Sequence, residues 1–152
     1  MTKKIILLLC VMTVFFSGAV LARSHQETAD WVAIKLGNGN DNVYFFNVNS
    51  LHYDVDENGK IHKNVIVYEE KKINRNTATL SEGFYSITQC KINLTDKSLM
   101  LGEETFYKKD GEKRWSEKPL YLVWYVVKPG TIGETRYNAV ADYVKNNPEK
   151  VK

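Results

Sequence analysis

The chain has 152 residues, of which 43% are hydrophobic and 12% aromatic, and its formal net charge is +3. A chain of this length and composition is expected to form one domain around one hydrophobic core. The small net charge gives no electrostatic reason to expect nucleic acid as a partner.

Residues 1–22 have the parts of a secretory signal peptide. Lys3 and Lys4 precede an uncharged apolar run, and Ala22 supplies a small side chain at a cleavage site before Arg23. The run is shorter than the roughly 20 apolar residues that span a bilayer, which favours a cleaved signal over a membrane anchor. Loss of the two lysines lowers the formal charge from +3 to +1. We therefore expect an exported protein, periplasmic, secreted or at the cell surface, with no membrane span after cleavage.

The remaining chain is expected to contain a short polar lead (residues 23–29), one domain (residues 30–146) and a disordered tail (residues 147–152). Within the domain, segments rich in β-branched and aromatic residues alternate with turns formed by Gly, Asn and Asp. These segments predict strands at residues 31–36, 42–46, 52–55, 61–72, 83–93 and 98–107, and one or two more within 115–127.

Two interruptions of the strand pattern have specific interpretations. The stretch from residue 73 to residue 82 is polar and lacks an apolar period, so we expect a mobile loop between two halves of the sheet. Pro119 is expected to interrupt the last strand region or to mark a sheet edge, because proline cannot donate a ladder hydrogen bond.

The helix signal is confined to the C-terminal part of the chain. Thr131 and Glu134 have the spacing of a capping box, in which the threonine hydroxyl accepts from the Glu134 amide and the carboxylate reaches back to the Thr131 amide. One apolar stripe then follows at helical spacing, formed by Tyr137, Val140, Ala141 and Val144. The chain is therefore expected to have an α+β fold, with antiparallel strands and one C-terminal helix on a face of the sheet.

Cys90 is the only cysteine outside the expected signal peptide, so no internal disulfide is expected in the mature chain. It shares strand parity with Phe84 and Ile92, which indicates a core-facing thiol rather than a nucleophile. The serines lack a Gly-x-Ser-x-Gly elbow. We expect no catalytic residue and no enzyme activity.

Two further patterns resemble ligand sites. Residues 54–59 match the first half of a calcium loop, but Val65 stands where a closing glutamate is needed, which favours a hairpin turn. His52 and His62 flank that hairpin and are expected to face each other, without further ligands for a metal. No metal or cofactor is expected.

Aromatic residues are frequent in the predicted strands, and they fit either an exposed recognition face or a well-filled sheet. Both interpretations stay open, because adjacent aromatics such as Trp124 and Tyr125 point to opposite faces of a strand.

A set of residues spread over most of the chain resembles the surface-adhesin protein E-like family of small exported bacterial proteins. The permissive positions are Trp31, the aromatic pair and turn within residues 44–51, Cys90 and Tyr107. The specific motif runs from residue 124 to residue 134 and contains Trp124, Pro129, Gly130, Thr131, Gly133 and Glu134.

The resemblance implies a curved antiparallel sheet of about six strands with the C-terminal helix packed on its concave face. It also implies binding at the cell surface to host extracellular proteins such as laminin, vitronectin or plasminogen. Two departures from the family pattern are visible: no second cysteine follows Glu134, and the signal peptide has no lipidation motif around Cys10.

These observations lead to two hypotheses of function. The first is an exported, non-enzymatic binding protein, an adhesin-like module that recognises a protein ligand. The alternative is a soluble periplasmic or envelope protein that binds or inhibits an enzyme, or carries a small ligand in the concave face. Whether the chain forms a homodimer is left open.

Overall fold

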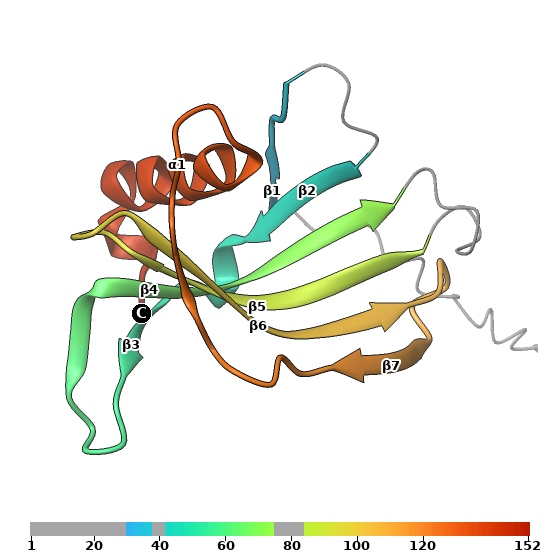
Figure 1. The fold of residues 1–152 in the computed structure, drawn as a ribbon, viewed down its shortest axis with the longest axis horizontal. Coiled ribbons are helices and arrows are strands. Elements are labelled where there is room, and N and C mark those ends of the chain that lie inside the picture. Colours follow the sequence, from blue (N-terminus) through green and yellow to red (C-terminus); the bar gives the residue numbers. More distant parts are fainter. Residues whose placement is uncertain (1–29, 38–41, 75–83) are drawn as a thin grey trace, which may run out of the picture.

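The computed structural model describes residues 30–37, 42–74 and 84–152. The expected signal peptide, the polar lead, and parts of the expected loops (residues 38–41 and 75–83) lie outside the described residues. Within them the chain forms one antiparallel sheet and one α-helix (Figure 1). The elements are β1 (Trp31–Ile34), β2 (Asn42–Asn47), η1 (Val48–Ser50), β3 (His52–Val55), β4 (Ile61–Asn74), β5 (Tyr85–Asn93), β6 (Ser98–Tyr107), β7 (Lys113–Glu117), β8 (Trp124–Val126), α1 (Ile132–Asn146) and η2 (Pro148–Lys150).

The sheet has eight strands rather than about six, because its two longest strands each pair with two partners in succession. The main order is β1-β2-β4-β5-β6-β7, while β3 also pairs with β4 and β8 also pairs with β6. β4 has fourteen residues; its first half pairs with β3 and its second half pairs with β2. The first residues of β6 face β8, and its last residues face β7.

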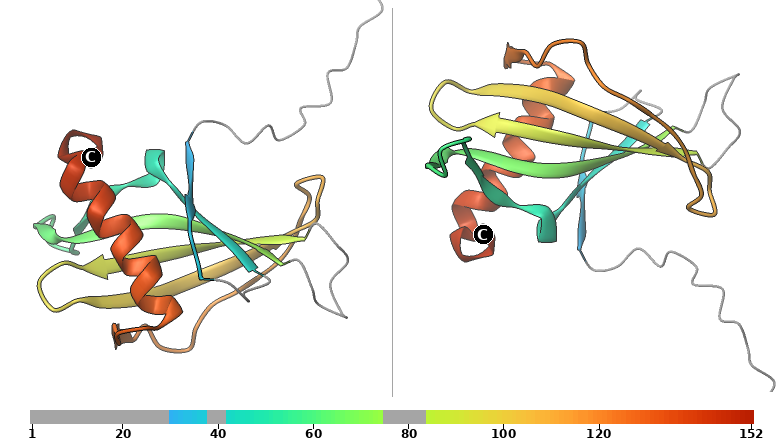
Figure 2. Two further views of the ribbon diagram at one scale, coloured as in Figure 1. Left: turned by 90° about the horizontal axis from the view of Figure 1, so that it is seen from above. Right: turned by 90° about the horizontal axis from the view of Figure 1, so that it is seen from below.

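The predicted α+β architecture is confirmed, with α1 lying across the concave side of a curved sheet (Figure 2). Tyr137, Val140 and Val144 of α1 are buried, as their spacing predicts, and Ala141 is partly buried. Their partners in the core come from five strands and the turn after η1, and include Ile34, Phe46, Leu51, Ile66, Tyr68, Cys90, Ile92 and Leu99. Burial of this apolar area is the main force that holds the helix on the sheet.

The start of α1 follows the predicted cap at Thr131, with one change. The Glu134 amide donates to Thr131 Oγ1 at 3.2 Å, as expected of an N-cap. The Glu134 carboxylate, however, accepts from the Gly130 amide at 2.7 Å and not from the Thr131 amide. Gly130 has φ +74°, and this left-handed turn brings its amide toward the carboxylate.

Two sequence-based boundaries differ from the structure. The predicted loop at residues 73–82 begins later, because Ile73 continues β4 and pairs with both Val43 and Tyr85. Residues 147–152, expected to be a disordered tail, contain η2, and the backbone of Lys152 exchanges hydrogen bonds with Leu51 and Tyr53. These bonds attach the segment to the start of β3, a partner that no local pattern reveals.

Candidate functional site

A buried ion pair fixes α1 against the sheet. Arg136 donates two hydrogen bonds to the Glu70 carboxylate, Nε to Oε2 at 2.7 Å and Nη2 to Oε1 at 2.6 Å. Glu70 is only 2% exposed, and the Arg136 guanidinium also lies 5.4 Å from the centre of the Tyr44 ring. The bidentate geometry suits a planar guanidinium and sets the position of the helix along the strands.

Both groups of this pair have shifted pKa values. Burial raises the pKa of the Glu70 carboxyl, and the charge and hydrogen bonds of Arg136 partly oppose that rise. Burial acts to lower the pKa of Arg136, but the Glu70 carboxylate outweighs it and the pKa is raised. This pair was not predicted from the sequence, although two signals were present: Glu70 has the strand parity of Tyr68, and Arg136 is four residues before Val140.

Cys90 lies in the core beneath α1, as its strand parity predicts. Its side chain is fully buried, and Sγ lies 3.7 Å from the Thr88 carbonyl oxygen. Burial raises the pKa of the thiol well above its usual value, so the reactive thiolate form is suppressed. This environment is that of a structural cysteine.

Within residues 54–59, Asp54 and Val55 end β3, and the residues after them form the predicted hairpin turn between β3 and β4. The Asp56 carboxylate accepts hydrogen bonds from the Asn58 and Lys60 amides, both at 2.9 Å, and Gly59 has φ +79°. The bond from the Lys60 amide is the main cause that holds the pKa of Asp56 below its usual value. This use of the carboxylate in the turn explains the sequence pattern without a bound ion.

The two histidines beside this hairpin do not face each other, contrary to the prediction. His62 lies opposite Asp54 and contacts Asp56 at 3.2 Å, whereas His52 lies opposite Val67. The hairpin register already places His62 opposite Asp54, and a register shift between Tyr53 and Asp54 moves His52 further along β4. The described part of the chain has no group of three or more His, Cys, Asp or Glu side chains placed to hold a metal ion.

The motif residues lie along the path from β8 into α1. Trp124 is the first residue of β8 and is 37% exposed, Pro129 and Gly130 form the exposed turn, and Thr131 is the helix N-cap. Gly133 and Glu134 are in the first turn of α1. Trp31, by contrast, is on β1, with Lys71 Nζ 5.8 Å from the centre of its ring.

Residues 120–126 form an exposed apolar surface, which we call the 120–126 surface. Leu120 is 93% exposed and Tyr121 is 82% exposed, and every residue from Leu122 to Val126 is also exposed. Single exposed apolar residues are common on proteins, and seven in succession make this segment a candidate interaction surface.

The path of the chain explains why this surface stays open. After β7 the chain leaves the sheet at Pro119, passes over the sheet face opposite α1 and returns as β8, which pairs with β6 (Figure 1). Lys118 forms an ion pair with Glu103 at 3.3 Å. Pro119 and Leu122 enclose a cavity of about 260 Å³ against Val67 and Met100. Leu120 and Tyr121 lie between these contacts and remain outside the packed layer.

The predicted interruption at Pro119 is therefore confirmed, and the region from 115 to 127 holds parts of two strands. The aromatic set is divided between the two interpretations that the sequence left open. Phe46 is in the core, whereas Tyr121 and Tyr125 are among the most exposed aromatics. The sequence signal for the 120–126 surface was an unbroken run of apolar residues. A half-buried strand would instead alternate apolar and polar residues.

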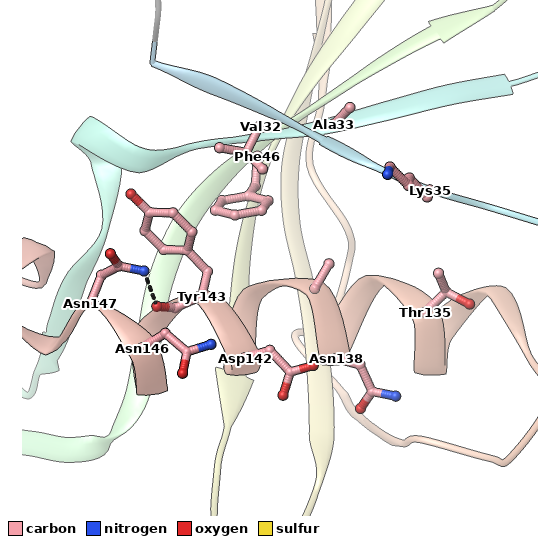
Figure 3. Close-up of a pocket in the computed structure, with 11 residues that line it drawn as sticks. Val32, Ala33, Lys35, Phe46, Thr135, Asn138, Asp142, Tyr143, Asn146 and Asn147 are labelled. Atoms are coloured by element: carbon pink, nitrogen blue, oxygen red, sulfur yellow. Dashed lines mark hydrogen bonds between the residues drawn. The ribbon is translucent and has the colours of Figure 1, made fainter.

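A second open feature lies between β1 and α1, and we call it the β1–α1 groove (Figure 3). It is a cavity of about 500 Å³. Its apolar part is formed by Val32, Phe46, Ala139 and Tyr143, and the rings of Phe46 and Tyr143 meet edge to face at 5.3 Å. Its polar part is a row on α1, formed by Thr135, Asn138, Asp142 and Asn146.

The described residues thus define a mostly β protein with an open antiparallel sheet, one C-terminal helix and two open surfaces. No helix within residues 30–37, 42–74 and 84–152 is long and apolar enough to cross a bilayer. No family model matches the chain, and no curated protein matches it.

Among solved structures, the fold is similar to the crystal structure of protein E from non-typeable Haemophilus influenzae. The two chains share 14% sequence identity, with a TM-score of 0.47, and the similarity covers 80% of this chain and 79% of that chain. Protein E is a structural neighbour of this chain.

Proposed function

We propose that the protein is an exported binding protein that holds a protein ligand on the 120–126 surface. The observation that carries this proposal is the exposure of seven consecutive apolar residues in a folded chain. Hydrophobic burial gives about 25 cal/mol per Å², and a standard interface covers roughly 800 Å² on each partner. Two tyrosines and a tryptophan add the residue types that are enriched at interface centres.

The proposed ligand is an extracellular protein of a host, and the proposed location is the outside of the cell. The resemblance to surface-adhesin proteins supports this choice, together with the expected signal peptide at residues 1–22. No cofactor or catalytic residue takes part in the proposed function. The competing occupant of the same surface is a second copy of the chain.

The alternative hypothesis was a soluble envelope protein that binds or inhibits an enzyme, or carries a small ligand in the concave face of the sheet. In the structure, α1 packs on this face through Tyr137, Val140 and Val144, and the β1–α1 groove stays open beside it. Seven exposed apolar residues in succession lie elsewhere, at 120–126. The proposal of a protein-binding surface therefore uses the area that the fold leaves open.

A pair of matched double variants tests this proposal. Leu120→Ser with Tyr121→Ser removes apolar area from the 120–126 surface, and Val55→Ser with Ile61→Ser removes exposed apolar area from the β3–β4 hairpin. Binding of the mature protein to immobilised laminin, vitronectin and plasminogen is measured by surface plasmon resonance. Burial of one large apolar side chain is worth about 1.5–3 kcal/mol, so the first variant should lose at least tenfold in affinity.

The control variant should bind as the unmodified protein does. Equal loss in both variants, or no binding of the unmodified protein, contradicts the proposal. Protease added to intact cells tests the location separately: the protein should be digested, and complete protection would place it inside the envelope. Sedimentation velocity then shows whether a second copy occupies the surface, because a dimer that the first variant abolishes would assign it to self-association.

A further inference from the structure

We propose that the β1–α1 groove is a second binding site, in which an extended segment of a protein partner adds as a strand beside β1 and places a basic side chain against Asp142. This site lies on other elements than the 120–126 surface and does not depend on it. The occupant follows from three features: the edge of β1 that no described strand covers, the shape of the groove and its charge.

The hydrogen-bond phase of β1 shows which backbone groups are free. The Val48 amide donates to the Asp30 carbonyl at 2.8 Å, and β1 continues from there in antiparallel register with β2. Because hydrogen-bonded pairs alternate along an antiparallel ladder, Val32 and Ile34 direct their N–H and C=O groups to β2. Trp31 and Ala33 therefore direct theirs to the free edge, where an added strand can use them.

This edge lacks the protection that strand edges commonly have. At the other end of the main strand order, β7 carries Lys113, Arg114 and Glu117, which discourage pairing with another chain. The sequence of β1 is Trp-Val-Ala-Ile, without charge or proline. An extended segment at this edge therefore finds no charged side chain of β1, and each residue of β1 has a backbone N–H group.

The groove next to β1 has polar and apolar sides that suit such a segment. Thr135, Asn138, Asp142 and Asn146 follow one stripe of α1 at spacings of three and four residues, so the polar row extends along the helix (Figure 3). The apolar residues Val32, Phe46, Ala139 and Tyr143 offer a contact for alternate side chains of the added strand. A helical partner would have no backbone groups free to pair with β1.

Charge selects the side chain that the segment places over α1. Asp142 is exposed on the groove and makes no ion pair or hydrogen bond with any described residue. A lysine or arginine of the added strand would form an ion pair with the Asp142 carboxylate. Lys35 lies at the strand end of the same groove and disfavours a second basic residue there.

The probe is a capped nine-residue peptide in which threonine alternates with valine or lysine. Two isomers carry N-methyl groups on alternate amides, either on all the threonines or on all the valines and lysines. Because successive N–H groups of a strand point to opposite edges, each isomer loses the donors of one edge only. Binding is followed by NMR titration of the mature protein, with the amide signals of Trp31 and Ala33 as reporters.

Strand addition predicts that one methylated isomer keeps the affinity of the parent peptide and the other loses it. Ala33→Pro removes the free donor without removing a ladder bond, and it should weaken binding about tenfold, as expected for one hydrogen bond. Ala33→Val keeps that donor and serves as the control. Asp142→Asn should weaken binding of the lysine peptide, but it should not change binding of a peptide with threonine in place of lysine. Urea unfolding of each variant confirms that the fold is retained.

Three results would overturn the proposal. They are equal affinity of both methylated isomers, unchanged binding by Ala33→Pro, and no shift of the Trp31 and Ala33 signals at millimolar peptide. Each of them would show that the edge of β1 does not pair with the segment.

Discussion

Replacing Arg136 by methionine should destabilise the fold by about 3–5 kcal/mol, because it leaves a buried carboxylate without its partner. The Glu70 side chain is 3% exposed and the Arg136 side chain is 13% exposed. The two hydrogen bonds between them, at 2.6 and 2.7 Å, are the only hydrogen bonds of the Glu70 carboxylate to described residues. A domain is stable by about 5–15 kcal/mol, so the loss is a large part of the total.

Replacing both residues of the pair measures the interaction energy between them. In the double variant Glu70→Met with Arg136→Met both charges are gone, and the stability should return to within about 1–2 kcal/mol of the unmodified protein or exceed it. Urea unfolding of the four proteins closes a double-mutant cycle. A coupling energy below about 0.5 kcal/mol would refute the reasoning, since it would mean that water already screens the pair.

The pH dependence of the Arg136→Met variant gives an independent check. Burial raises the pKa of Glu70 above its ordinary value of 4.5, and the variant lacks the Arg136 interactions that oppose this rise. A carboxyl group with a raised pKa in the folded state contributes stability that is complete below its unfolded pKa and is lost as the pH rises through its folded pKa. The stability deficit of the variant should therefore be smaller below pH 4.5 than at neutral pH. A deficit independent of pH would contradict the assignment.

The other predictions concern local features. Cys90 should react slowly with a bulky maleimide in the native protein and quickly in denaturant, because it is buried, and fast native labelling would place it at the surface. Thr131→Ala should cost about 1 kcal/mol in urea unfolding through loss of the helix cap, and unchanged stability would argue against the cap. Calorimetry should detect no micromolar calcium binding at residues 54–59, whose Asp56 is engaged in the turn. Mass spectrometry of the exported protein should show Arg23 as its first residue, and a retained Met1 would exclude cleavage.

The features that the sequence predicted well are those that depend on near neighbours. The cap at Thr131 needs a partner three residues away, and the burial of Cys90 follows from the alternation along one strand. The stripe of Tyr137, Val140 and Val144 likewise repeats at the helical period. Such patterns carry their own geometry, so one sequence is enough to recognise them.

The features that it missed join distant parts of the chain. Glu70 and Arg136 are 66 residues apart, and neither side chain alone indicates a buried pair. The second partners of β4 and β6 depend on where the chain returns after each turn. The exposure of residues 120–126 has the same origin, because an apolar run at a sheet edge and an apolar run in a core have the same composition.

Photo-crosslinking from the 120–126 surface tests the proposed function most directly. A photoreactive phenylalanine derivative replaces Tyr121, and in a matched control it replaces Ile61 on the exposed β3–β4 hairpin. Cells that export each protein are irradiated in the presence of the extracellular protein that binds best. We expect a crosslinked product between this chain and that protein from position 121 and none from position 61. Crosslinking only to a second copy of the chain, or equal crosslinking from both positions, would contradict the assignment of this surface.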